Sequence, residues 1–176
     1  MKLHNAAGSL AEFFEAAKTL PEKLRSVKTL GDAAEAALEA VNAMNKALRE
    51  AEKAGAPREL LERLKGYRDV VLKVADVYST LDAATKNIAK GLERYSSEGI
   101  SQAKPNLSAG ISQFLEAIKG VEELVALTAK LGLTDLNHAF AEWHRRLLES
   151  YKEWKKSILS SDTRAETRRL FEDVER

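Results

Sequence analysis

One stretch of the sequence, from residue 57 to residue 95, carries a sustained heptad repeat. A 3.5-residue repeat requires left-handed supercoiling, because the stripe on a straight helix with 3.6 residues per turn would rotate away from its partner. We therefore predict one long helix of about 58 Å, at about 1.5 Å per residue, packed lengthwise against other helices. The stripe alternates in steps of four and three, and all but one of its members are apolar or aromatic: Leu60, Leu64, Tyr67, Val71, Val74, Tyr78, Leu81, Thr85, Ile88, Leu92 and Tyr95.

Two later segments, residues 107–125 and 136–158, repeat the same stepping. Val70, Val77 and Ala84 widen the stripe of the long helix, which favours a bundle over a two-stranded coiled coil. The fold class predicted is all-α: an elongated antiparallel helical bundle with coiled-coil-like packing, about four long helices and short N- and C-terminal helices. We assign residues 1–176 to a single domain, with an N-terminal helical arm (1–31), a bundle core (32–160) and a short C-terminal helix (161–176).

The N-terminal third contains strong signals for helix boundaries. They divide it into two short helices followed by a longer, alanine-rich one: the capping box Ser9–Glu12, Pro21, Gly31, Asp32 and Gly55. Only a few residues separate Gly55 from the heptad helix, so the helices on either side should be antiparallel neighbours.

Serine, glycine and proline mark residues 96–105 as the most loop-like part of the chain. Gly132 and Thr134 predict the boundary between the next two helices. Ser161 and Asp162 are expected to cap a last short helix.

The balance of charge excludes some partners. The chain has 28 basic and 27 acidic side chains and no strongly basic segment, so we expect no nucleic acid partner. No stretch is apolar enough for a transmembrane segment, although peripheral membrane contact stays open. The lack of cysteine excludes disulfides and thiolate sites, and favours the cytoplasm without settling the compartment.

The common catalytic motifs are missing. The sequence has neither a phosphate-binding P-loop nor a Gly-x-Ser-x-Gly elbow. Asp135, His138 and Glu142 share one helical face, but three ligands from one helix rarely converge on one ion, and Asp135 suits a first turn. We therefore expect a protein that is not an enzyme, with no catalytic residues, no metal site and no cofactor.

Two groups of apolar and aromatic residues are candidate binding sites. Trp143, Tyr151 and Trp154 lie at helical spacing on an apolar stripe, which is typical of core packing. The N-terminal arm carries an apolar face that is the candidate interaction face of the chain: Leu10, Phe13, Phe14 and Ala17. We expect this face to dock on the bundle more readily than on a membrane, because the opposite face is not rich in Lys and Arg.

The leading hypothesis is a soluble helical-bundle scaffold or protein-interaction module, with a protein partner or self-association. A first alternative is membrane binding or curvature, because residues 57–160 resemble BAR-type domains in architecture, though in no sequence motif. A second is a helical toxin, effector or pore-forming segment. The idealised helix ends around Gly55 also favour partial redesign of a natural bundle, that is, a redesigned or de novo protein.

Overall fold

The computed structural model describes residues 2–176, with side chains described from Ala6 onward. This part of the chain contains helices and short connections and no strand. The helices follow one another in the order α1 (Lys2–Ser26), α2 (Leu30–Lys53), α3 (Arg58–Glu98), α4 (Ile100–Lys130), α5 (Thr134–Ser161) and α6 (Ala165–Glu175). The predicted all-α bundle is confirmed. Within the described residues, no helix is both long enough and apolar enough to span a membrane.

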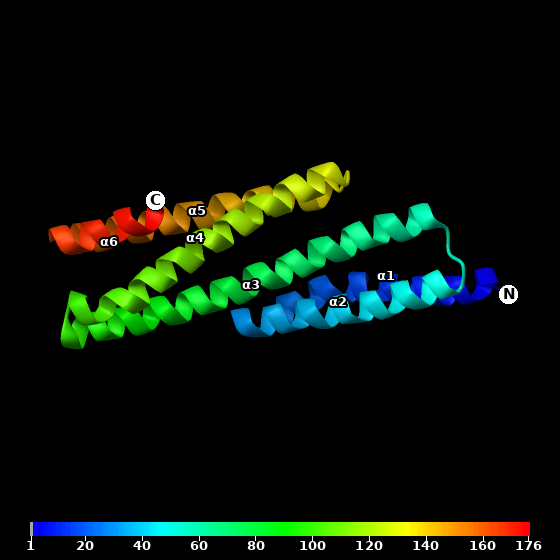
Figure 1. The fold of residues 1–176 in the computed structure, drawn as a ribbon, viewed down its shortest axis with the longest axis horizontal. Coiled ribbons are helices and arrows are strands. Elements are labelled where there is room, and N and C mark those ends of the chain that lie inside the picture. The colour runs from blue at the N-terminus through cyan, green and yellow to red at the C-terminus, as the bar shows by residue number, and fades with distance from the viewer. Residues whose placement is uncertain (1) are drawn as a thin grey trace.

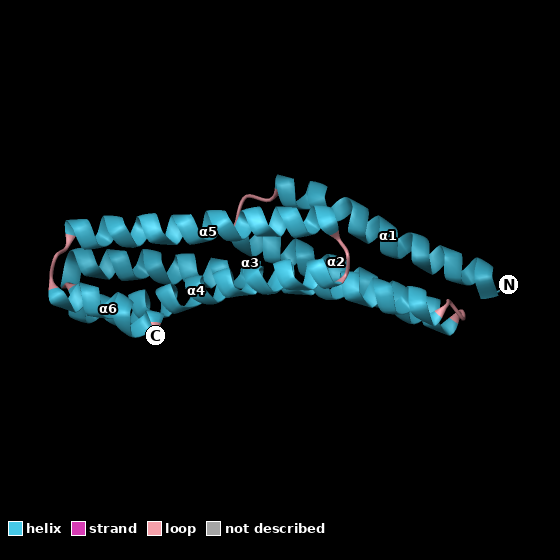
Figure 2. Cartoon of the chain, turned by 90° about the horizontal axis from the view of Figure 1, so that it is seen from above, coloured by secondary structure: helices cyan, strands magenta, loops and turns pink. Residues whose placement is uncertain are grey.

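The heptad segment forms α3, a single helix of 41 residues that extends along most of the molecule (Figure 1). Helix α2 packs against α3, and α1 packs against α2. On the other side, α4 folds back along α3 and carries α5 and α6. The molecule is elongated and visibly bent along its length (Figure 2).

The core is divided into three clusters along the long axis. The first joins α1, α2 and the start of α3, and includes Phe13 and Met44. The second joins the middle of α3 to α4, with Val70, Val77 and Val121 at its centre. The third joins α4, α5 and α6 around Phe171. Helix α3 has neighbours on two sides, which is the reason why its apolar stripe is wider than a coiled-coil seam.

Small residues allow α3 and α4 to approach closely. The widening positions Val77 and Ala84 are almost fully buried, at 2% and 0% exposed. A Cβ added at Gly110 of α4 would lie 3.0 Å from the backbone nitrogen of Ile88 and 3.1 Å from the carbonyl oxygen of Ala84. At this point the two helices are packed with no room for a side chain on α4.

The predicted break between two short N-terminal helices is wrong, because α1 continues from Lys2 through Pro21 to Ser26. Proline removes one backbone hydrogen bond, but the apolar face continues on both sides of it with Phe13, Leu20 and Leu24 packed into the first cluster. Burial of this face along α2 keeps the helix continuous through Pro21. The capping box Ser9–Glu12 therefore lies inside a helix, and Thr29 caps α2 in place of Asp32 by accepting the Asp32 amide.

The loop predicted over residues 96–105 is also wrong. Only Gly99 separates α3 from α4, with φ of 89° and ψ of 177°, a conformation that suits glycine. The hydroxyls of Ser96 and Ser97 donate to the carbonyl oxygens of Leu92 and Glu93 one turn back, so both serines fit within α3.

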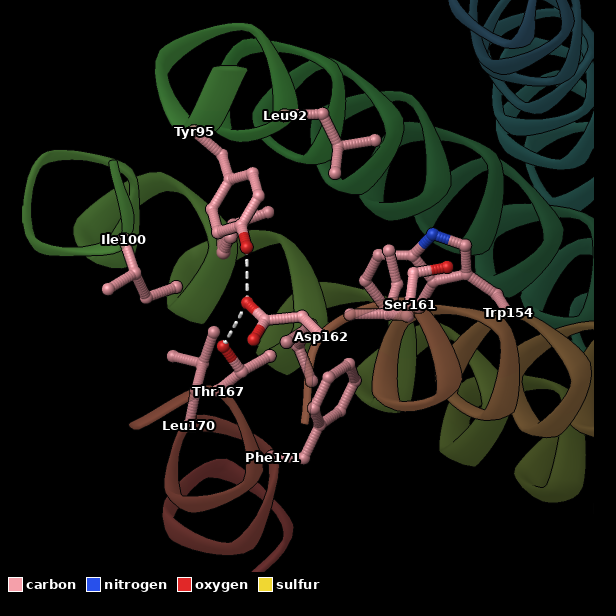
Figure 3. A pocket seen from close by; sticks show the side chains of 12 residues that line it. Leu92, Tyr95, Ile100, Trp154, Ser161, Asp162, Thr167, Leu170 and Phe171 are labelled. Atoms are coloured by element: carbon pink, nitrogen blue, oxygen red, sulfur yellow. Dashed lines mark hydrogen bonds between the residues drawn. The ribbon is translucent and has the colours of Figure 1, made fainter. Parts of the chain in front are cut away.

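Asp162 ties the end of α5 to α3 and α6. Its carboxylate accepts hydrogen bonds from the Tyr95 hydroxyl and, at 2.8 Å, from the Thr167 hydroxyl (Figure 3). The Arg164 guanidinium donates to the same carboxylate. These donors hold the pKa of Asp162 well below its usual range, with Arg164 the largest cause. Asp162 is thus the C-cap residue of α5, and its side chain also accepts a hydrogen bond from Thr167 in the first turn of α6.

Asp162→Asn is expected to lower stability at neutral pH, and by a smaller margin as the pH falls below about 4. A carboxyl group whose pKa is depressed in the folded protein stabilises the fold above the unfolded pKa of about 3.9, and this contribution is lost as the pH falls further. Urea unfolding at pH 7 and at pH 3 would measure the gap between wild type and variant. A gap of equal size at both pH values would show that the charge of Asp162 has no part in stability.

Candidate interaction surface

A groove opens where α1, α3 and the α4–α5 connection come together, with a volume of about 680 Å³. We call it the Phe14 groove. It is lined mainly by apolar side chains, with two basic residues and no carboxylate: Phe13, Phe14, Ala17, Lys18, Leu60, Arg63, Leu64, Tyr67, Leu131 and Leu133. The groove exists because α1 packs on α2 and leaves the side of α3 next to the α4–α5 connection uncovered.

The two adjacent phenylalanines of α1 have opposite environments. Phe13 is 1% exposed and its ring meets the edge of Tyr67 at a centroid distance of 6.3 Å. Phe14 is 53% exposed, the highest value among the large exposed hydrophobic side chains that are described. The exposed Phe14 ring and the apolar lining of the groove together leave a contiguous apolar surface open to water.

The four residues of the predicted interaction face therefore divide. Phe13 belongs to the core, Leu10 and Ala17 are half-buried against the same cluster, and Phe14 points outward. Phe14, Phe13 and Ala17 all line the groove. Sequence reasoning missed Leu131 and Leu133. They belong to the α4–α5 connection, about 70 residues after Leu60, and nothing in the sequence links this connection to α1.

Both charged residues of the Phe14 groove are cationic. Lys18 and Arg63 lie on opposite walls, on α1 and α3, and neither forms an ion pair within the described part of the chain. Burial raises the pKa of Tyr67 on the groove floor, so its hydroxyl stays protonated at neutral pH. The groove thus presents apolar surface flanked by positive charge.

The other sequence candidates have structural roles. Trp143 packs on Tyr78 at a centroid distance of 5.2 Å, and Tyr151 is buried with its ring stacked on Phe114. Partial burial, aided by a hydrogen bond to Glu175, raises the pKa of Tyr151.

Glu142, one of the residues on the face shared with Asp135 and His138, forms ion pairs within α5. Glu142 accepts hydrogen bonds from Arg145 and Arg146, and the contact with Arg145 lowers the pKa of Glu142 to about 2. Arg145 also pairs with Glu149 at 2.9 Å. Among the residues that the structure describes, no group of three or more His, Asp or Glu side chains is arranged to hold a metal ion.

Comparison with protein-family models, with curated proteins and with solved structures finds no match to this chain.

Proposed function

We propose that this chain is a non-enzymatic interaction module that binds an amphipathic helical segment of a protein partner in the Phe14 groove. The observation that carries the proposal is the contrast between Phe13 and Phe14. One ring is needed to hold α1 on the bundle, and its neighbour is exposed at the edge of an apolar groove.

The lining of the Phe14 groove suits an amphipathic helix. Helices bind in grooves through apolar anchors at i, i+3 or i+4 and i+7, and the groove offers apolar side chains from three separate elements to such anchors. Lys18 and Arg63, each without an ion-pair partner, complement a segment that carries Asp or Glu beside its anchors. The partner we infer is therefore an acidic amphipathic helix.

A display experiment tests this proposal. Helical peptides would be selected on the immobilised full chain, and we expect enrichment of apolar anchors at helical spacing with flanking acidic residues. Binding of the selected peptides should weaken by about 30-fold in Phe14→Ala, as for an interface residue that contributes about 2 kcal/mol.

Leu38→Ala is the matched control, because Leu38 is also exposed, at 45%, but lies on α2 outside the Phe14 groove. Its affinity for the selected peptides should equal that of the wild type. Peptides that bind Phe14→Ala as tightly as the wild type, or a selection without enrichment, would refute the proposed site.

Membrane binding is the second candidate function, supported by the bend of the elongated bundle (Figure 2). An exposed aromatic ring beside Lys18 and Arg63 could also insert into an anionic surface. Co-sedimentation with vesicles of phosphatidylserine and phosphatidylcholine at low salt tests it. Absence of binding to these vesicles would end this hypothesis and leave the protein-binding proposal intact.

A further inference from the structure

A second hollow lies at the opposite end of the molecule, between α3, α4, α5 and α6. It is a cavity of about 120 Å³, more enclosed than the Phe14 groove. Figure 3 shows Leu92, Ile100, Trp154, Leu170 and Phe171 around it. Its walls come from four helices whose apolar stripes meet here without filling the space.

The polar groups at one end of the cavity are already satisfied. Asp162 accepts hydrogen bonds from Tyr95, Thr167 and Arg164, so its carboxylate has no need of a further donor. No buried polar side-chain atom of the described residues lacks a hydrogen-bond partner. The cavity therefore offers nothing that selects for a polar ligand or holds water by several hydrogen bonds.

The cavity adjoins a groove that is open to solvent. Leu92 and Trp154 line it and also line an open groove of about 340 Å³ between α3 and α5. Leu92 is 36% exposed, so its side chain stands at the boundary between the cavity and the groove. A molecule that enters past Leu92 could leave a substituent in the groove beside Ile88 and Phe114.

We propose that this cavity binds a small apolar molecule, an aromatic ring with or without a short alkyl chain. An engineered apolar cavity of about 150 Å³ stays dry and binds benzene. A space of about 120 Å³ lined mainly by Leu, Ile, Phe and Trp is therefore of the right order for one ring. The ring occupies the cavity, and an alkyl chain extends past Leu92 into the groove. This site is separate from the Phe14 groove and does not depend on it.

Titration of the isotope-labelled full chain with benzene and with n-butylbenzene, followed by NMR, tests the proposal. We expect saturable shifts confined to the lining residues, including the Trp154 indole, and a higher thermal midpoint at saturation. n-Butylbenzene should bind more tightly, by about fourfold for each methylene that the groove buries. The absence of saturable shifts, or shifts centred elsewhere, would overturn the proposal.

Two substitutions on the same helix provide a matched pair. Leu92→Trp places a larger side chain at the opening and should abolish binding of both compounds. Leu72→Trp, at a position 38% exposed and outside the cavity, should leave binding unchanged. Ile158→Phe, which fills the cavity from α5, should also abolish binding and raise the thermal midpoint. Retention of benzene binding by either folded cavity variant would show that the ligand sits elsewhere.

Discussion

Phe13→Ala is expected to lower the free energy of unfolding by about 3–5 kcal/mol, the usual cost of removing a fully buried phenylalanine. The Phe13 ring is 1% exposed and packs within the cluster that joins α1, α2 and the start of α3, so its removal leaves a cavity between α1 and the rest of the bundle. Urea unfolding followed by circular dichroism measures the loss.

Phe14→Ala is the matched control at the neighbouring position. Because the Phe14 ring is 53% exposed, its removal should change the free energy of unfolding by no more than about 0.5 kcal/mol. The two variants therefore separate folding from binding: the first weakens the fold, and the second weakens the binding of the selected peptides. A loss below about 1 kcal/mol for Phe13→Ala would show that α1 is not held by this ring.

Gly110→Val is expected to destabilise the chain by about 3 kcal/mol, at the upper end of the cost of overpacking. The atoms that the new Cβ would meet include the backbone of α3 at Ile88 and Ala84, which cannot move aside by a change of rotamer. The two long helices would have to separate. Thermal and urea unfolding of the variant would measure the effect.

Gly8→Val is the control for Gly110→Val, since nothing lies within 4 Å of a Cβ added at Gly8 in α1. Valine has a somewhat higher helix propensity than glycine, so this variant should match the wild type in stability or slightly exceed it. Equal destabilisation by both substitutions would mean that the close approach of α3 and α4 is not the cause.

The helical periodicity was sufficient to predict α3 and the bundle. The stripe of α3 has the heptad repeat that is typical of a long helix packed lengthwise on other helices. The widening positions Val77 and Ala84 are almost fully buried, as expected of a bundle. Errors arose where local signals compete with tertiary packing. Pro21 and the serines near Gly99 favour helix ends in isolation, but the apolar face of α1 is packed on both sides of Pro21, and the serine hydroxyls donate to carbonyl oxygens within α3, so both helices continue.

The candidate site was only partly predictable for a related reason. The apolar face of α1 was visible in the sequence, but which of its two phenylalanines is buried depends on the direction from which α2 and α3 approach. Leu131 and Leu133 complete the Phe14 groove from a distant connection. The cavity near Asp162 is the result of four helices that meet imperfectly, which no single segment encodes.

The structure implies that one chain completes its own core and leaves the Phe14 groove open. Light scattering over a range of concentrations tests this most directly. A monomer with a mass of 19.5 kDa at all concentrations is the predicted result. A dimer that Phe14→Asp dissociates would show that a second copy of the chain fills the groove, and a dimer that persists in Phe14→Asp would show that two chains associate through a surface outside the groove. Either result would contradict the proposed arrangement.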